Sequence, residues 1–319
     1  MTAYDLGRHF ACTMNDAFSH IFDQLLNAKQ EENLSERDFA RGLEQEFASA
    51  QADWLSRDQE LLQGLSLDTY LETLNEDDFY LFFKGMAEQS DFPLPEIFEV
   101  KFSALPEAKQ EVFLNDVLKL RPDLSDSDER RLAEVFFLQQ ALHLLAIPNK
   151  ADLMEEIIDW YLQGPQPDER VSDAMASYVK ALPPELLDDL ILILEREIKE
   201  NPNSDRGLDR LLEGMVVLAK KSPDGRQKAY PVFRLAFRKF TNKQLVTICL
   251  GDLGTLSAIP LLRSYIEDHH ETIDRSLYLE IISAIKRLGG STEDLPRPFG
   301  QDLDLDDRLK FLFGLGGGA

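Results

Sequence analysis

The segment Leu250-Gly251-Asp252-Leu253-Gly254 ends one apolar, helix-like stretch of this 319-residue chain. Another such stretch ends at Leu288-Gly289, about 35 residues later, and earlier ones end at Ile147-Pro148, Leu182-Pro183 and Leu218-Ala219 at similar intervals. This interval fits a helix, a short turn, a second helix and another turn. Because such a pair of helices cannot bury its apolar face alone, neighbouring pairs must stack. The repeat therefore predicts an α-α superhelix of stacked helical hairpins.

The composition is that of a folded protein with an unusual acid excess. Apolar residues make up 44% and charged residues 29% of the chain, and 58 acidic against 34 basic residues give a net charge of −24. Phosphate backbones and anionic lipid surfaces should repel such a molecule, so neither nucleic acid nor membrane is an expected partner. The acid excess is about twice as large in residues 1–150 as in the rest, which suits a basic protein partner for that half. High negative charge is equally the mark of a well-solvated helical surface.

The cysteines and the N-terminal residues point to the cytoplasm. Only Cys12 and Cys249 are present, too few and too far apart for a disulfide framework. Residues 1–10 lack a basic start followed by an apolar run, which argues against a secretory signal. No apolar stretch has the length that a membrane-crossing helix needs.

Nearly every segment has the apolar spacing of a helix, and the expected fold class is all-α. In the N-terminal part, a first amphipathic helix near 6–25, a second that begins at Ser35-Glu36-Arg37-Asp38 and a third over 76–89 precede shorter helices up to Leu120. Further helices are expected near 127–147, 150–163, 168–182, 184–200, 205–220, 227–240, 242–253, 255–267 and 273–288.

Residues 121–128 are polar, contain a proline and end in helix-capping residues, and are the predicted boundary. We therefore expect an acidic N-terminal helical domain over residues 1–121, a linker over 122–126, a helical repeat array over 127–290 and a C-terminal tail over 291–319.

The last two units of the predicted array resemble HEAT-type repeats. The resemblance rests on Leu250-Gly251-Asp252-Leu253-Gly254, on Ala258-Ile259-Pro260-Leu261-Leu262 and on Ala284-Ile285-Lys286-Arg287-Leu288-Gly289. In this family the Leu-Gly ends one helix and the Ala-Ile-Pro opens the next, with proline near the first turn. The Asp-Val-Arg expected before the second helix is absent, and Ile273-Asp274-Arg275 lies a few residues early. The resemblance implies a protein-binding scaffold.

Two groups of side chains could in principle bind a metal. His9, Cys12, Asp16, His20 and Asp23 share one side of the first helix, but they extend over more than three turns and cannot surround one ion. The adjacent His269 and His270 diverge in direction and lie where a helix ends, a position that favours such residues anyway. We therefore expect no metal site.

Known catalytic motifs are also missing. The chain has no His-Glu-x-x-His, no phosphate-binding loop and no Gly-x-Ser-x-Gly. We expect no catalytic residues and no cofactor.

One segment is locally basic. Between residues 220 and 243 the only acid is Asp224, and the cations are Lys220, Lys221, Arg226, Lys228, Arg234, Arg238, Lys239 and Lys243. The interleaved aromatics Tyr230, Phe233, Phe237 and Phe240 are expected to form the core stripe of the helix. The cations could bind an acidic peptide, a phosphate group or the acidic half of a second copy. Exposed runs of charge are more often a solvated helix face that pairs with acids of the same molecule.

The tail is a second unusual segment. Asp302, Asp304, Asp306 and Asp307 are followed by Leu309, Phe311, Leu312, Phe313 and Leu315. Such a segment could be a docking peptide, or it could fold back and cap the open end of the array.

Three hypotheses for function follow. The first is a non-enzymatic protein interaction module that uses the helical array. The second is an enzyme or small-molecule binder whose pocket lies between the N-terminal domain and the array, lined by Phe79, Phe82 and Phe83, which would otherwise be plain core. The third is a self-assembling structural protein in which residues 220–243 of one copy meet the acidic half of another.

Overall fold

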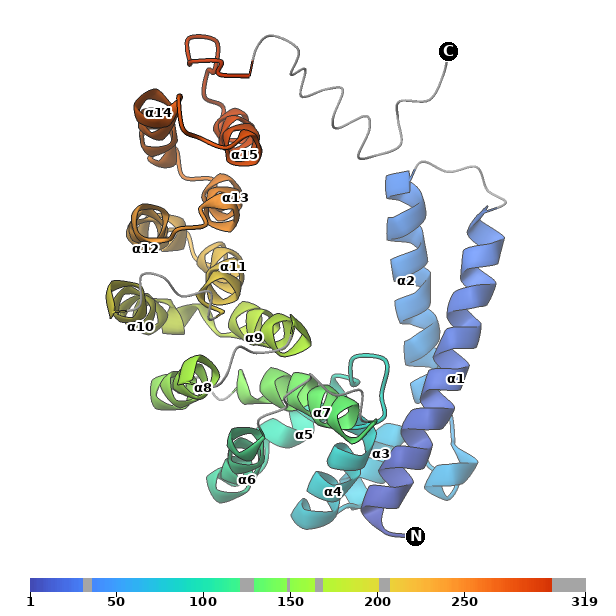
Figure 1. Ribbon diagram of the computed structural model, residues 1–319. Helices are drawn as coiled ribbons and strands as arrows, with labels where there is room; N and C mark the ends of the chain where they lie inside the picture. The colour runs from blue at the N-terminus through green and yellow to red at the C-terminus, as the bar shows by residue number, and fades with distance from the viewer. Residues whose placement is uncertain (31–35, 121–128, 148–149, 164–168, 201–206, 300–319) are drawn as a thin grey trace. The chain divides into compact units, whose positions relative to one another are not determined.

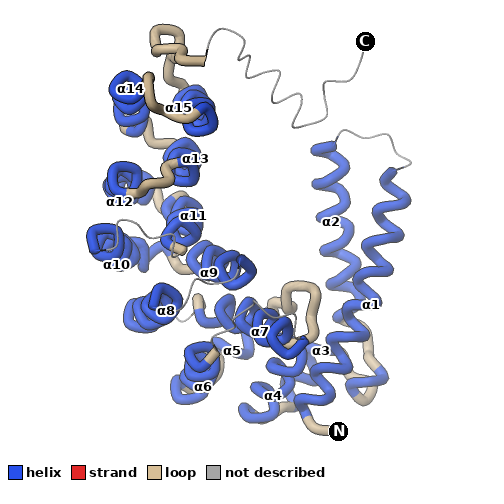
Figure 2. Tube along the Cα trace, in the orientation of Figure 1, coloured by secondary structure: helices blue, strands red, loops and turns tan. Residues whose placement is uncertain are grey.

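The protein is all-α. The computed structural model describes residues 1–30, 36–120, 129–147, 150–163, 169–200 and 207–299, and these contain helices, turns and loops but no β-strand (Figures 1 and 2). The chain forms two compact units, one made of Met1–Pro148 with Asp168–Ala174 and the other of Asn149–Pro167 with Met175–Ala319. The predicted linker 122–126 lies outside the described residues.

The first unit contains seven helices among its described residues, besides the start of α9. They are α1 (Ala3–Gln30), α2 (Glu36–Leu55), α3 (Leu67–Thr73), α4 (Glu76–Ala87), α5 (Ile97–Ser103), α6 (Glu107–Lys119) and α7 (Glu129–Leu145), with a short 3-10 helix at Glu60–Leu62. Ser66 and Asn75 cap α3 and α4, since each side chain accepts a hydrogen bond from the backbone N–H three residues on. The predicted start of the second helix at Ser35 lies outside the described residues.

Aromatic side chains fill the core of the first unit. Phe79, Phe82 and Phe83 of α4 have no exposed surface. The Phe83 and Phe113 ring centroids are 5.0 Å apart, and the Phe82 ring stacks on Phe98 at 6.3 Å. The aromatic stripe of α4 is therefore core, and the second hypothesis loses the side chains that were to line its pocket.

Two glycines let α1 and α4 cross with their backbones in contact. A Cβ atom on Gly7 would overlap the carbonyl oxygen of Phe82, and a Cβ atom on Gly85 would overlap the carbonyl oxygen of Tyr4. Neither obstacle is a flexible side chain, so a larger residue at either position would push the two helices apart.

The second unit consists of helices in two rows (Figure 1). One row holds α8 (Ala151–Gln163), α10 (Leu187–Glu200), α12 (Gly225–Lys239) and α14 (Ala258–His269). The other holds the end of α9 (Glu169–Ala181), α11 (Leu208–Ala219), α13 (Gln244–Leu253) and α15 (Arg275–Arg287). In the first row α8 contacts α10, α10 contacts α12 and α12 contacts α14. In the second row an ion pair joins Lys180 of α9 to Glu213 of α11, and α11 contacts α13, which contacts α15. From α10 onward, helices adjacent in the chain also contact each other across the rows. This pattern is that of stacked helical pairs.

All nine helices predicted between residues 127 and 288 are present in the described residues as α7 to α15, with ends that differ by a few residues. The repeated Leu-Gly marks also end helices as expected. Gly254 follows α13 with a φ of 75° and Gly289 follows α15 with a φ of 78°, a left-handed conformation that glycine adopts without strain.

Ion pairs join successive helices of each row. Arg196 of α10 binds Glu155 and Asp159 of α8, at 2.8 Å and 3.3 Å. In the other row, Arg287 of α15 binds Asp252 of α13. These pairs are partly exposed, so each contributes less than about 1 kcal/mol, and the buried apolar stripes supply most of the stability.

Residues 291–299 of the predicted tail lie against the last two helices. Arg263 of α14 binds Asp294, and the Tyr278 hydroxyl of α15 donates to the Pro296 carbonyl oxygen at 3.1 Å. The Phe299 ring also packs on Tyr278, at 5.6 Å between centroids. The described part of the tail thus covers the end of the array, whereas residues 300–319 lie outside the described residues.

No helix in the described part of the chain combines the length and the apolar character needed to cross a membrane.

The substitution Gly85→Ala tests the contact between α1 and α4. The alanine should gain about 1 kcal/mol of helix propensity but lose more through the clash with the Tyr4 backbone, so we expect the first unit to be about 2 kcal/mol less stable. Gly42→Ala is the matched control, because its Cβ would meet only the end of the flexible Lys29 side chain. Urea unfolding followed by circular dichroism measures both. Equal stability of Gly85→Ala and the unchanged protein would contradict the close crossing.

Candidate functional site

Helix α12 separates apolar from basic side chains. Ala229, Val232, Phe233, Ala236 and Phe237 are buried and recur at spacings of three and four, so they form one face of the helix. The segment Gly225–Lys239 contains five cations and no acid, and all five are exposed on the other faces. Packing of the apolar face therefore directs the charge of α12 into solvent.

Three of the eight predicted binding residues are engaged in contacts within the second unit. The Lys221 ammonium donates to the Leu182 carbonyl oxygen at 2.9 Å, and Lys228 binds Asp188 of α10 at 2.9 Å. The Lys243 ammonium donates to the Phe240 carbonyl oxygen at 2.5 Å. Partial burial lowers the pKa of Lys221 and of Lys243, whereas the hydrogen bond to Asp188 raises the pKa of Lys228. These lysines stabilise the packing of the helices.

The other five predicted residues have no such acidic partner. They are Lys220, Arg226, Arg234, Arg238 and Lys239, and each is exposed with no carboxylate within ion-pair distance in the described part of the chain. Among the described residues, Lys228 is thus the one cation of this segment that pairs with acids, and these five side chains are exposed to solvent.

Three of the free cations follow a four-residue spacing along α12. Arg226, Arg234 and Arg238 share this spacing, and Tyr230 fills the remaining position of the row. At 1.5 Å per residue the row rises about 18 Å along the helix, with about 6 Å between successive positions, and because each step turns by about 40° the row winds around the helix. We call these four residues the α12 ridge.

Tyr230 belongs to this ridge and not to the core stripe that the sequence predicts. Its side chain is half-buried, and its hydroxyl donates to the Ser257 carbonyl oxygen at 2.7 Å. Burial raises the pKa of Tyr230, while the positive charges of Arg234 and Arg238 act in the opposite direction. The prediction was wrong here because Tyr230 sits at the edge of the apolar face, where its polar end can reach the turn before α14.

An exposed leucine lies beside the start of the ridge. Leu256, in the turn between α13 and α14, is 68% exposed. Its neighbour Thr255 donates to the Arg226 carbonyl oxygen at 3.4 Å, and its other neighbour Ser257 accepts from Tyr230. The sequence did not single out Leu256, because its nearness to the ridge arises only from the packing of α12 against this turn.

The guanidinium groups of the ridge can bind anions. Guanidinium groups bind carboxylates and phosphates through two parallel hydrogen bonds, and successive arginines can bind successive anionic groups of one ligand. The arrangement therefore suits recognition of an extended anionic ligand.

The side chains considered as metal ligands are spread over the surface. His9, Cys12, Asp16, His20 and Asp23 are all exposed on α1. His269 stacks on Tyr265 and His270 contacts the Glu267 carbonyl oxygen, so both close the end of α14. Among the described residues, no group of three or more His, Cys, Asp or Glu side chains could hold a metal ion.

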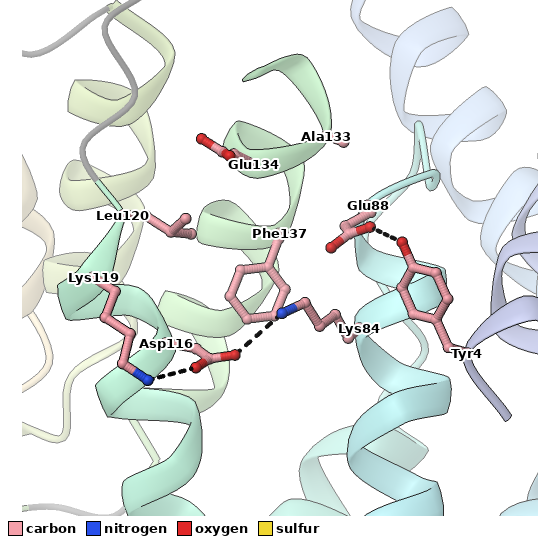
Figure 3. A pocket seen from close by; sticks show the side chains of 9 residues that line it. All are labelled: Tyr4, Lys84, Glu88, Asp116, Lys119, Leu120, Ala133, Glu134 and Phe137. Atoms are coloured by element: carbon pink, nitrogen blue, oxygen red, sulfur yellow. Dashed lines mark hydrogen bonds and ion pairs between the residues drawn. The ribbon is translucent and has the colours of Figure 1, made fainter. Parts of the chain in front are cut away.

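The first unit contains a cavity of about 370 Å³ that the sequence did not predict (Figure 3). Its lining comes from α1, α4, α6 and α7 and the residues that follow α4 and α6. Lys84 and Lys119 both bind Asp116, at 3.2 Å and 3.3 Å, and the Tyr4 hydroxyl donates to Glu88. Because Tyr4, Lys84 and Asp116 are far apart in the chain, no local spacing could indicate that they line one cavity.

Two tyrosines and a carboxylate in and beside this cavity have altered acidity. Burial and the hydrogen bond to Glu88 raise the pKa of Tyr4 to about 12. Burial and a hydrogen bond to Asp116 likewise raise the pKa of Tyr80. For Asp116 burial opposes ionisation, but hydrogen bonds from Tyr80 and Lys84 outweigh it and lower the pKa. The described charges of the cavity are thus largely paired with one another, as in a structural network.

Comparisons with known proteins give no assignment: the chain matches no known family, and no similar curated protein or solved structure was found.

The lowered pKa of Asp116 predicts a pH-dependent contribution to stability. The ionised carboxylate stabilises the folded protein above the ordinary aspartate pKa of about 4, and this contribution is lost as the pH falls through the lowered folded-state value. Asp116→Asn should therefore be less stable than the unchanged protein near neutral pH, with a difference that shrinks in acid. Urea unfolding at several pH values measures it.

Asp77→Asn is the matched control, because Asp77 pairs with Lys109 on an exposed surface, and its loss should cost well under 1 kcal/mol. A stability difference for Asp116→Asn that stays the same between neutral and acidic pH would show that ionisation of Asp116 plays no part.

Proposed function

We propose that this protein is a non-enzymatic interaction module whose second unit, a HEAT-like array of stacked helical pairs, binds an acidic segment of a partner protein along the α12 ridge. One observation carries the proposal. In a chain with a net charge of −24, Arg226, Arg234 and Arg238 are exposed along one helix with no acid paired to them in the described residues.

The chemistry of the ridge favours an acidic protein segment over nucleic acid. A nucleic acid would meet the repulsion of the whole acidic molecule, whereas a short acidic peptide need approach only the ridge. The exposed Leu256 beside the ridge adds an apolar contact that a peptide with both acids and leucines can use. The same reasoning disfavours an anionic membrane surface and is consistent with a cytoplasmic module.

The arginines suit this role better than the lysines of the same segment. A guanidinium group keeps its charge when it is desolvated at an interface and presents two donors in the geometry of a carboxylate. Lys221, Lys228 and Lys243, by contrast, contact neighbouring parts of the second unit. The segment therefore divides into residues that hold the array together and residues left to bind a partner.

A second candidate function rests on the cavity in the first unit, whose 370 Å³ could hold a small polar molecule. Lys84 and Asp116 would contact such a ligand, though it would have to compete with their mutual pairing. This function would be favoured if a compound from a metabolite library raised the temperature at which the first unit unfolds.

The proposed function predicts that reversing two charges removes partner binding without unfolding the protein. The variant Arg234→Glu/Arg238→Glu should lose partners that the unchanged full chain captures from a cell lysate, because the ridge would repel an acidic segment. Both positions are exposed, so stability should change by less than about 0.5 kcal/mol for each substitution. Quantitative mass spectrometry of the captured proteins measures the loss.

The matched control is Arg275→Glu/Lys286→Glu, which reverses two exposed charges on α15, away from the ridge. It should retain the partners, and their recovery should fall as salt rises. The role of the ridge would be contradicted if the ridge variant still captured the partners. It would also be contradicted if both variants lost them to the same extent.

A further inference from the structure

Two opposite charges that line the cavity of the first unit are not paired with each other. Lys84 of α4 and Glu88, which follows this helix, lie one helical turn apart, since the Glu88 N–H donates to the Lys84 carbonyl oxygen at 3.1 Å. A lysine and a glutamate at this spacing often form an ion pair. Here Lys84 instead binds Asp116 of α6 at 3.2 Å, and Glu88 accepts a hydrogen bond from Tyr4 of α1 (Figure 3). Packing against α1 and α6 therefore gives each charge a different partner.

The positive side of the cavity carries more charge than its acid neutralises. Lys84 and Lys119 both bind the carboxylate of Asp116, so two ammonium groups share one acid. An ammonium group has three N–H donors, and Asp116 needs only one of those that Lys84 carries. This eases the competition between Asp116 and a ligand, because a ligand carboxylate can bind Lys84 while the pair with Asp116 persists.

Glu88 supplies the negative side. Its hydrogen-bond donor, the Tyr4 hydroxyl, is neutral, because burial and this hydrogen bond raise the pKa of Tyr4 to about 12. In the described part of the chain no cation lies within ion-pair distance of Glu88. Its carboxylate therefore keeps the capacity to accept hydrogen bonds from an ammonium group. The other acid of the lining besides Asp116, Glu134 of α7, is already engaged.

Apolar side chains complete the lining. Phe137 of α7 is buried, and Leu120 and Ala133 belong to the same cavity (Figure 3). The Lys84 Nζ atom is 5.4 Å from the centre of the Phe137 ring, so the charged and apolar parts of the lining adjoin. Lys119 is 72% exposed, which shows that the cavity reaches the surface at this side. Its volume of about 370 Å³ is that of a small ligand pocket.

We infer that this cavity binds an amino acid with an apolar side chain. The carboxylate of the ligand binds Lys84, its ammonium group binds Glu88, and its side chain packs on Phe137. A zwitterion is favoured because a molecule with a single charge satisfies only one of the two sides. The inference rests on the cavity of the second candidate function, for which it names the class of ligand, and it is independent of the α12 ridge.

Titration calorimetry of the full chain with each of the twenty standard amino acids, at millimolar concentrations, tests the class of ligand. We expect an apolar amino acid such as leucine, methionine or phenylalanine to bind best. Its N-acetyl form keeps the carboxylate and loses the ammonium charge, and its amide form does the reverse. Each should bind about tenfold more weakly than the amino acid itself, because one charge-assisted hydrogen bond is lost.

The variant Glu88→Gln tests the negative side and leaves an oxygen that can accept the Tyr4 hydrogen bond. It should bind the best amino acid about tenfold more weakly, and bind the N-acetyl form as the unchanged chain does, because that form has no ammonium group to lose. A merely structural role for Glu88 would weaken both ligands alike. Glu96→Gln is the matched control, since it neutralises an exposed acid outside the cavity and should retain amino-acid binding.

The outcomes separate this inference from the functions proposed above. Failure of all twenty amino acids to bind would overturn it, and so would equal binding of an amino acid and its N-acetyl form. If a compound with one charge or none raised the unfolding temperature of the first unit instead, the cavity would remain a small-molecule site and only the amino-acid class would be wrong. Partner capture by the α12 ridge is measured with other variants, so that proposal stands or falls alone.

Discussion

Burial of the apolar side of each helix against its neighbours is the constraint on which the second unit depends. A single helical pair exposes too much apolar surface, so α10, α12 and α14 pack in one row and α11, α13 and α15 in the other. For α12 this packing has a second consequence. Once Phe233 and Phe237 are buried, the helical period leaves Arg234 and Arg238 no place except the solvent. The same contact that holds the array together therefore exposes its basic ridge.

The first unit is built on a different constraint. Gly7 and Gly85 allow α1 and α4 to meet backbone to backbone, and this crossing brings Tyr4 of α1 close enough to donate a hydrogen bond to Glu88 at the end of α4. The network of Asp116 with Lys84 and Tyr80 adjoins it. The charges of the cavity thus have partners within the fold, whereas the arginines of the α12 ridge have no acidic partner among the residues that the structure describes. We give the ridge priority over the cavity as a functional site for this reason.

The charge of the protein is unevenly distributed along the chain. Most of its surface repels anions, and the acid excess is larger in residues 1–150. The ridge is a local exception that only a ligand able to approach it closely can use.

Local periodicity is what made much of this structure predictable. The spacing of Phe233 and Phe237, the Leu253-Gly254 end of α13 and the run of cations around Arg234 depend on neighbours within a few residues, and a helix translates such spacing directly into faces and ends. The sequence by itself therefore determined an all-α chain, the positions of the repeated helices and the presence of a basic face.

The tertiary structure decided which side chains of that basic face make contacts within the protein and which are exposed. Lys228 meets Asp188 and Lys221 meets the Leu182 carbonyl because α12 and the end of α11 pack on earlier helices, and Leu256 lies beside Arg226 for a similar reason. The approach of Gly7 to Gly85 and the assembly of the cavity around Asp116 also join residues far apart in the chain. Contacts between distant residues depend on how whole helices pack, so the local spacing of three or four residues in the sequence does not predict them.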